Sequence, residues 1–152
     1  MLNAVNAGKI DIIATDHAPH TIEEKEKDYS ESPAGIPLVQ HALLSLLDHY
    51  HNGTFKLEKI VQMICHNPAL RYCVKDRGFI REGYFADLVL FDLSQTTSVS
   101  KTNLLYKCGW SPFEGHQFQS KICSTFVNGV QAFDGNQVVS EMGNAKALEF
   151  ER

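Results

Sequence analysis

The chain has 152 residues, of which 43% are hydrophobic and 21% charged, as is typical of a globular protein of ordinary size. Its formal net charge of −4 argues against a nucleic acid or an anionic membrane surface as the partner. No apolar run approaches the roughly 20 residues of a membrane-spanning helix, and the N-terminal residues do not resemble a secretory signal. No two of the four cysteines form a CxxC pair, so we interpret them as reduced thiols of a cytoplasmic protein: Cys65, Cys73, Cys108 and Cys123.

The first elements predict a buried strand that ends in polar residues. Leu2 to Ala7 is interpreted as the end of a helix, with Gly8 as its C-cap. Ile10–Thr15 is nearly continuous in apolar residues, which favours a strand covered on both faces, as in parallel sheets and barrels. Asp16 follows where that strand should end, and the catalytic groups of α/β barrels lie at the carboxyl ends of strands.

The segment 16–33 is predicted to be a long loop, which in a compact domain is either functional or disordered. Within it, the mixed charges of Glu23–Asp28 favour a solvated turn or a short helix. Ser32–Gly35 leads into the next predicted helix, whose free N–H groups could hold an anion or a carbonyl oxygen. An ordinary helix entry without a ligand explains the same residues equally well.

Three helices are predicted after the loop. Ile36–Tyr50 has apolar residues at helical spacing, with Pro37 suited to its first turn. Leu57–Ile64 is a second, shorter amphipathic helix. Asn67 is predicted to cap a third helix that runs from Pro68 to about Val74. A strand, a long loop and a helix in this order form a βα unit, so we expect residues 1–75 to belong to an α/β domain.

Residues 76–152 are predicted to form a separate small β module. Strands are expected at Ala86–Leu93, Ile122–Val127 and Val130–Phe133, continued by Val138 and Val139. The Asn128-Gly129 pair between two of them is a strong hairpin signal. Residues 94–120 are long and irregular, and we expect them to cross a surface or to pack back on the first half of the chain.

Asp16, His17 and His20 are the residues most suited to carry chemistry. A carboxylate and an imidazole on one proline-containing loop could bind a metal, relay a proton or hold an anionic substrate. A purely structural role for Asp16, accepting N–H groups of its own loop, is the alternative.

The remaining histidines are not expected to form a metal site. His49 and His51 spell an HxH pair, but residues two apart on a helix point about 200° away from each other and cannot converge on one ion. His66 and His116 are isolated, and His41 is interpreted as a packing residue of the long helix.

The stretch ATDHAPHTIEEK (Ala14–Lys25), followed by SPAGIPLVQ (Ser32–Gln40), closely resembles the signature of the dihydroorotases in the amidohydrolase superfamily. The later NPA (Asn67–Ala69) and GFIREGYFADLVLFD (Gly78–Asp92) are similar to the end of those enzymes. The resemblance implies an α/β fold: the C-terminal part of a (β/α)8 TIM-barrel amidohydrolase, with its last strand and following helices, plus a small β-rich module.

The resemblance also implies roles for individual residues. Asp16 matches the strand-end aspartate that ligates the metal and acts as general acid and base. His20 matches the histidine that contacts the substrate carboxylate, and Ala34 and Gly35 match the loop whose backbone meets the substrate ring. No ligand role is carried over to His17.

The activity implied is the reversible, zinc-dependent hydrolysis of the cyclic amide of dihydroorotate to N-carbamoyl-L-aspartate in pyrimidine biosynthesis. One or two zinc ions are implied, and their other ligands are expected outside this chain, which alone would be a catalytically incomplete fragment with exposed apolar surface. We expect a homo-oligomer, and the resemblance implies aspartate transcarbamoylase as a further partner. The alternatives are a related hydantoinase or allantoinase, and a non-catalytic dihydroorotase-like subunit that supports such a partner. Asp16 and His20 argue against the non-catalytic alternative.

Overall fold

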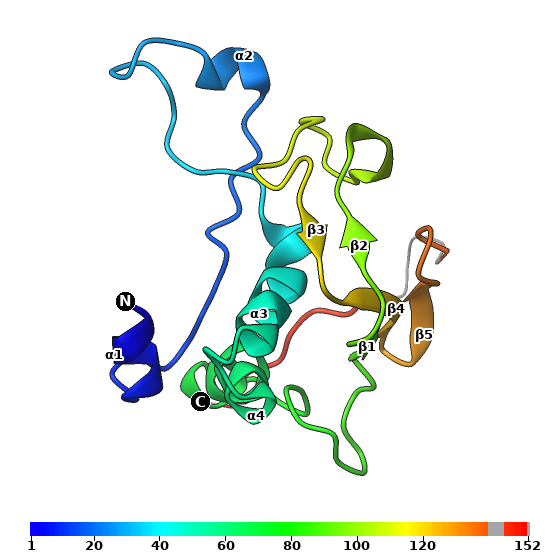
Figure 1. Cartoon of the computed structure of the whole chain (residues 1–152). Coiled ribbons are helices and arrows are strands. Elements are labelled where there is room, and N and C mark those ends of the chain that lie inside the picture. The colour runs from blue at the N-terminus through cyan, green and yellow to red at the C-terminus, as the bar shows by residue number, and fades with distance from the viewer. Residues whose placement is uncertain (140–144, 152) are drawn as a thin grey trace.

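The N-terminal helix α1 (Leu2–Asn6) is joined to the short helix α2 (Ile22–Lys25) by a long extended segment, as the computed structural model in Figure 1 shows. The structure describes residues 1–139 and 145–151. Gly8 follows α1 with a positive φ of 68°, which is the left-handed conformation that commonly ends a helix. The predicted helix and its glycine stop are therefore confirmed, and the charged run after Thr21 contains the short helix that was one of its two interpretations.

The predicted strand Ile10–Thr15 is not formed in this structure. The segment is extended, but its residues pair with no other strand among the described residues, and a strand exists only through such pairing. Ile10 and Ile13 instead pack against a helical core, and the Ile13 N–H points to the carbonyl of Met63 at 3.4 Å. The prediction that apolar residues of this segment are packed against the core is therefore confirmed for Ile10 and Ile13. The prediction that the segment is hydrogen-bonded to neighbouring strands is wrong for the described residues.

The long helix begins later than predicted. A 3₁₀ turn, η1 (Val39–His41), leads into α3 (Ala42–His51), whereas Ile36 and Pro37 remain extended. Ile36 forms a parallel bridge with His17, which explains why helical spacing in the sequence does not become helix at this point. Tertiary pairing has overridden the local preference.

The second and third predicted helices form one rod. Helix α4 (Leu57–Val61) passes through a π-helical turn, η2 (Gln62–His66), into α5 (Asn67–Arg71) without a break. Asn67 has helical φ and ψ of −63° and −42°, so the prediction that it is an N-cap is wrong. The wider π turn accommodates Pro68, which has no N–H to donate. The Asn67 side chain instead donates to the Asp11 carbonyl at 2.6 Å.

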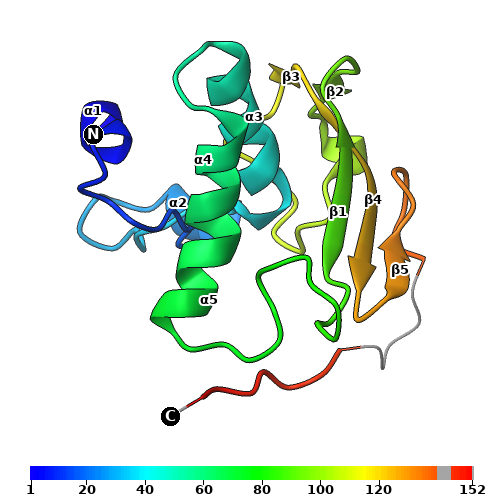
Figure 2. The same ribbon diagram turned by 90° about the horizontal axis from the view of Figure 1, so that it is seen from below.

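A three-stranded antiparallel sheet in the order β1-β4-β5 confirms the predicted strands of the second half. Its members are β1 (Leu88–Asp92), β4 (Lys121–Val127) and β5 (Val130–Phe133), and Val138 adds a bridge to Phe133. Asn128 and Gly129 connect β4 to β5 with φ of 51° and 83°, as a type I′ hairpin turn requires. Figure 2 shows this sheet on one side of the molecule and helices α3, α4 and α5 on the other.

Residues 94–120 pack back on the first half of the chain, as predicted. They contain a second small sheet of β2 (Thr97–Ser98) and β3 (Gln117–Phe118), with the 3₁₀ turn η3 (Lys101–Asn103) between them. Asp48 on α3 accepts hydrogen bonds from the Gln119 N–H at 3.0 Å and pairs with His116 at 2.8 Å.

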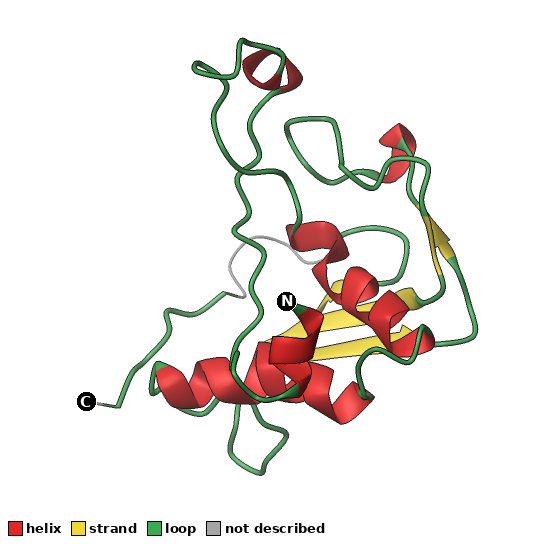
Figure 3. Ribbon diagram, turned by 60° about the vertical axis from the view of Figure 1, so that its left-hand side comes forward, coloured by secondary structure: helices red, strands yellow, loops and turns green. Residues whose placement is uncertain are grey.

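The apolar core has two parts, which lie among the helices and strands coloured in Figure 3. The first joins α1 to the helical layer, with Val5, Leu46, Phe55, Ile60 and Met63. The second contains Leu44, Val99 and Phe118, so it draws on both sides of residue 76. The division of the chain at that residue stays a prediction.

All four cysteines are free thiols. Among the residues that the structure describes, no helix is long and apolar enough to cross a membrane.

Candidate active site

Asp16 lies at the end of the extended segment, with its side chain exposed. Its φ of 47° is left-handed, a conformation that aspartate and asparagine adopt more readily than most other residues. Within residues 1–139 and 145–151, its carboxylate has no hydrogen-bond or salt-bridge partner. The alternative that Asp16 serves to cap its own loop therefore finds no supporting contact, and both carboxylate oxygens are available to a ligand.

A parallel bridge brings the two halves of the motif together. His17 pairs with Ile36, and the Ala18 N–H donates to the Ile36 carbonyl at 3.2 Å. Gly35 makes the approach possible, because a Cβ on it would lie 2.4 Å from the Cβ of Ala18. Its φ of 96° also belongs to the region that glycine tolerates. Ala34 and Gly35 are thus held directly beside the DHAPH loop.

His17 has a structural role at the start of the helical segment. Its Nδ1 accepts hydrogen bonds from the backbone N–H groups of Leu38 and Val39, at 3.0 and 3.4 Å. These are N–H groups at the start of a helix, which have no partner within the helix itself. His17 therefore caps η1 and fixes the point at which the helical layer begins.

His20 is half-exposed and is oriented by Glu24. The Glu24 carboxylate lies 3.2 Å from His20 Nδ1, and Nε2 has no hydrogen-bond partner among the described residues. Glu24 also forms a capping box with Thr21, and the Thr21 N–H, with a smaller contribution from His20, lowers the pKa of Glu24. With protons on both ring nitrogens, the imidazole can donate from Nδ1 to Glu24 and from Nε2 to an anion.

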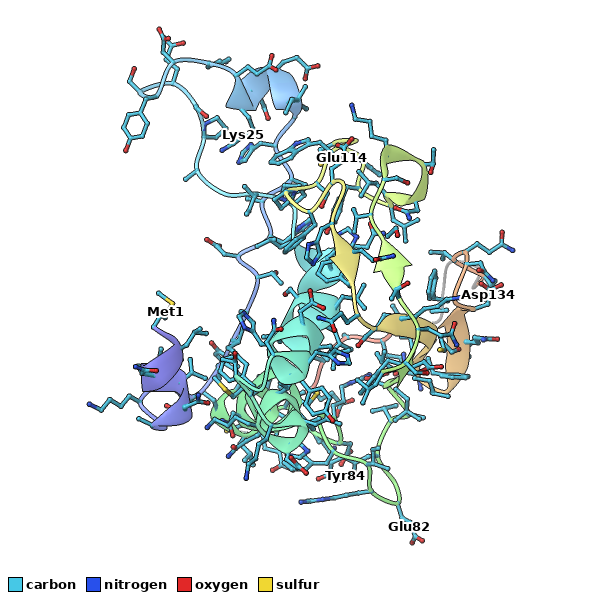
Figure 4. All side chains as sticks on the ribbon, in the orientation of Figure 1. Met1, Lys25, Glu82, Tyr84, Glu114 and Asp134 are labelled. Atoms are coloured by element: carbon cyan, nitrogen blue, oxygen red, sulfur yellow. The ribbon has the colours of Figure 1, made fainter. Side chains whose placement is uncertain are left out.

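Lys25 closes the loop that separates the two parts of the site. Its ammonium donates to the Pro33 carbonyl at 2.6 Å, and the Ser32 hydroxyl donates back to the Lys25 carbonyl at 3.3 Å. The residues between them project away from the molecule, and Tyr29 is fully exposed. Figure 4 shows Lys25 on the arm that carries α2. The EEK part of the motif therefore shapes the loop, a role that sequence reasoning did not assign.

The segment 106–111, from the second half of the chain, contacts the DHAPH loop and the start of the helical segment that follows it. Trp110 donates from its indole Nε1 to the His20 carbonyl at 2.8 Å. The Tyr106 hydroxyl accepts the Gln40 N–H at 3.0 Å, and the two rings of Tyr106 and His17 lie 5.5 Å apart. Sequence reasoning missed both aromatic residues, since no local pattern links them to a loop about 90 residues earlier.

His41 is buried beneath this segment, as its interpretation as a packing residue predicted. It is 2% exposed, and its ring stacks on Phe118 with 5.7 Å between the ring centroids. Its Nδ1 lies 3.3 Å from the Tyr106 hydroxyl oxygen. Burial lowers the pKa of the imidazole, because the charged form is poorly solvated there.

We expect the chain to lose stability as the pH falls below about 6.5, the usual pKa of histidine in an unfolded chain. Below that pH the unfolded chain takes up a proton that folded His41 accepts only at lower pH, so the free energy of unfolding decreases; above it, stability keeps its full value. Urea unfolding between pH 8 and pH 5 measures this. In His41→Gln the decrease should be smaller, whereas parallel profiles for the two proteins would contradict the prediction. The His116–Asp48 pair is common to both proteins and cancels in the comparison.

The HxH pair does not form a metal site. The His49 ring packs against Phe55 with 5.3 Å between the ring centroids. His51 instead forms a hydrogen bond between its Nε2 and the hydroxyl of the buried Ser120, at 2.9 Å. No group of three or more histidine, cysteine, aspartate or glutamate side chains is placed to hold a metal ion in the described part of the chain. The described residues alone therefore do not build a metal centre; Asp16 could contribute one carboxylate to a site completed by other residues.

A large cavity lies elsewhere. It measures about 1340 Å³ between α3 and the three-stranded sheet, and its lining includes Ile13, Val89, Ile122 and Phe133 but none of the four predicted site residues. Its volume would suit a ligand, but its lining does not suit the proposed chemistry. The lining residues are apolar or polar without charge, except for the ionisable Lys121 and His41. The chemically suited groups lie on the exposed DHAPH loop.

The motif and its geometry agree with the comparison to known proteins. The model of the amidohydrolase family matches residues 1–132. The chain belongs to the amidohydrolase family. Similar curated proteins are the dihydroorotases of Halobacterium salinarum, 39% identical over 131 residues, and of Methanosphaera stadtmanae, 39% identical over 124 residues. These alignments cover 86% and 82% of this chain but 31% and 29% of the relatives, so this amidohydrolase chain spans about a third of their length.

A solved structure supports the same fold. The L-hydantoinase (dihydropyrimidinase) from Arthrobacter aurescens superposes on 92% of the chain with a TM-score of 0.82 and 27% sequence identity, and the match covers 32% of that enzyme. The likeness confirms the predicted fold class, an α/β part of an amidohydrolase barrel with a small β module. The unpaired segment Ile10–Thr15 is consistent with a strand whose neighbours are not among the described residues.

Proposed function

We propose that this amidohydrolase chain forms part of a dihydroorotase, which opens the ring of dihydroorotate to N-carbamoyl-L-aspartate and closes it in pyrimidine biosynthesis. The observation that carries the proposal is the DHAPH loop, with Asp16 at one end and His20 at the other: the Asp16 carboxylate has no partner among the described residues, and Glu24 orients His20. The similarity to curated dihydroorotases supports the choice of substrate. We also propose a cytoplasmic homo-oligomer, with aspartate transcarbamoylase as a further partner.

Each proposed site residue has a distinct task. Asp16 takes a proton from the attacking water and delivers it to the ring nitrogen as the carbon–nitrogen bond breaks, which general acid–base catalysis requires. His20 donates from Nε2 to the substrate carboxylate, and the backbone of Ala34 and Gly35 contacts the ring. In ring closure the same groups act in the reverse order, and water is released.

Zinc is the cofactor we propose, with Asp16 as one ligand and the remaining ligands outside this chain. When bound, the metal activates the water and polarises the ring carbonyl. Asp16 suits this position because its carboxylate has no partner among the described residues.

A hydantoinase is the second candidate, because the solved structures that match the chain include hydantoinases. The two rings differ in one useful respect: dihydroorotate carries a carboxylate, and hydantoin does not. A histidine poised by Glu24 to donate to an anion favours the substrate with the carboxylate. Substrate preference therefore separates the two functions.

The test is a chimera in which this chain replaces the 124 matched residues of the Methanosphaera stadtmanae dihydroorotase. We expect the purified, zinc-loaded chimera to hydrolyse dihydroorotate and to leave hydantoin unchanged. His20→Ala should raise KM for dihydroorotate by about 10-fold or more, the loss of a charge-assisted hydrogen bond. A folded chimera that opens only hydantoin would establish the second candidate instead.

The chain by itself is expected to show no turnover of dihydroorotate, with or without added zinc. The reason is that its described residues supply one proposed metal ligand, and one carboxylate does not hold a catalytic zinc ion. An assay of N-carbamoyl-L-aspartate formation by the purified chain measures this. Zinc-dependent turnover that disappears in Asp16→Asn would show the prediction to be wrong.

A further inference from the structure

We propose that Trp110 is a positioning residue for the substrate carboxylate: it fixes the backbone of His20 so that the imidazole presents Nε2 to the anion. This inference rests on the proposed function of His20. The contact that carries it is the hydrogen bond from the Trp110 indole to the His20 carbonyl, at 2.8 Å across 90 residues of sequence.

The ring of His20 needs two independent restraints. Glu24 holds Nδ1 and so sets the rotation of the ring, but Glu24 belongs to the same short loop and moves with it. The His20 N–H bonds to the Ala18 carbonyl, which is also local. Trp110 comes from outside the loop, so its hydrogen bond ties the His20 backbone to the second half of the chain.

The segment that carries Trp110 is itself anchored. The neighbouring Ser111 is 6% exposed, and its hydroxyl accepts the Phe113 N–H at 3.2 Å and lies 3.5 Å from His41 Nδ1. Tyr106 accepts the N–H of Gln40 at the start of the helical layer. In Figure 4, Glu114 marks this loop on the side of the molecule toward Lys25.

The anchoring has a clear chemical consequence. A side chain held only by a mobile surface loop loses conformational freedom each time it binds a ligand, and this loss weakens binding. With Trp110 in place, the His20 backbone is already fixed before the anion arrives. The effect should therefore appear in substrate affinity and leave the rate of the bond-breaking step almost unchanged.

The contact can be tested directly in the full chain. Trp110 is the only tryptophan of the sequence, so a ¹⁵N-labelled sample gives a single indole N–H signal. We expect this proton to exchange with solvent at least about 10-fold more slowly than in the urea-unfolded chain, as a hydrogen-bonded donor does. Exchange at the unfolded rate would show that the bond is absent and would overturn the proposal.

The functional test uses the zinc-loaded chimera and the variant Trp110→Phe, which keeps an aromatic ring and removes the N–H donor. We expect KM for dihydroorotate to rise by about 3- to 10-fold with kcat within a factor of about two, the effect of one neutral hydrogen bond. Thr97→Val is the matched control, because it also removes one hydrogen bond within residues 94–120, from the Thr97 hydroxyl to the Ser120 carbonyl, but leaves the contact to His20 intact. Its KM should stay at the unsubstituted value.

A double variant separates positioning from general stability. If Trp110 acts through His20, then Trp110→Phe should add no further increase in KM to His20→Ala. Additive effects of the two substitutions, or an equal rise in KM for Thr97→Val, would overturn the proposal.

Failure of the proposed function has a different signature. An unsubstituted chimera that does not open dihydroorotate would refute that function and, with it, the role of Trp110 in binding the carboxylate. A chimera that opens dihydroorotate and needs His20, but is indifferent to Trp110→Phe, would refute only the present inference.

Discussion

Asp16→Asn is expected to lower kcat of the zinc-loaded chimera on dihydroorotate by about 100- to 10,000-fold, the usual contribution of a general acid–base residue. Asparagine cannot accept the proton from water or deliver it to the ring nitrogen. Loss of a proposed metal ligand adds to the effect. Initial rates of dihydroorotate hydrolysis, together with the zinc content of each purified protein, provide the measurement.

Asparagine is the informative substitution at this position because of the backbone. Asp16 has a φ of 47°, and asparagine tolerates this left-handed conformation about as well as aspartate does. An alanine would add backbone strain and would confuse folding with chemistry. The control is Asp11→Asn on the same extended segment, where the side chain is exposed and has no hydrogen-bond partner among the described residues, while the backbone carbonyl accepts from Asn67. Equal losses in the two variants would remove Asp16 from the proposed mechanism.

Gly35→Ala is expected to destabilise the chain by about 2–4 kcal/mol and to displace the proposed ring-binding loop. Two costs add. A Cβ at this position would lie 2.4 Å from the Cβ of Ala18, so the bridged segments must move apart. The φ of 96° is also unfavourable for any residue with a side chain. Urea unfolding of the chain measures the loss of stability.

Gly53→Ala is the matched control, because Gly53 also has a positive φ, of 69°, but a Cβ there would meet nothing within 4 Å. It should cost only about 1 kcal/mol, the strain of the backbone alone. The double variant Gly35→Ala with Ala18→Gly removes the collision and should recover part of the lost stability. If Gly35→Ala and Gly53→Ala cost the same, the close approach to Ala18 would not be a significant constraint.

The elements that could be predicted from the sequence are those defined by local chemistry. The Asn128-Gly129 turn requires left-handed residues, and the hairpin forms there. Ile10–Thr15 and Asn67 were predicted wrongly for the same reason: each has its conformation set by distant partners. Ile10–Thr15 pairs with no other strand among the described residues, and Asn67 continues a helix through a π turn that no local sequence pattern indicates.

In the candidate site, too, residues that belong to a local motif could be predicted and residues that reach the site from a distant segment could not. Asp16, His20, Ala34 and Gly35 were assigned from a specific motif, and their catalytic roles stay proposals. The Thr21–Glu24 capping box could have been identified from its spacing alone. Trp110 could not, because one tryptophan in an irregular segment carries no information about which loop it will reach.

The extended segment before the site has one further consequence, which concerns the order of folding. Its contacts join Asp11 to Asn67 and Ile13 to Met63, and His17 reaches Leu38 across 21 residues. Closing such loops costs entropy that local contacts do not repay, so we expect these pairings to follow the formation of the helices. The twelve residues of the ATDHAPHTIEEK stretch are therefore the most diagnostic part of the sequence, and we expect them to be among the last to acquire their shape.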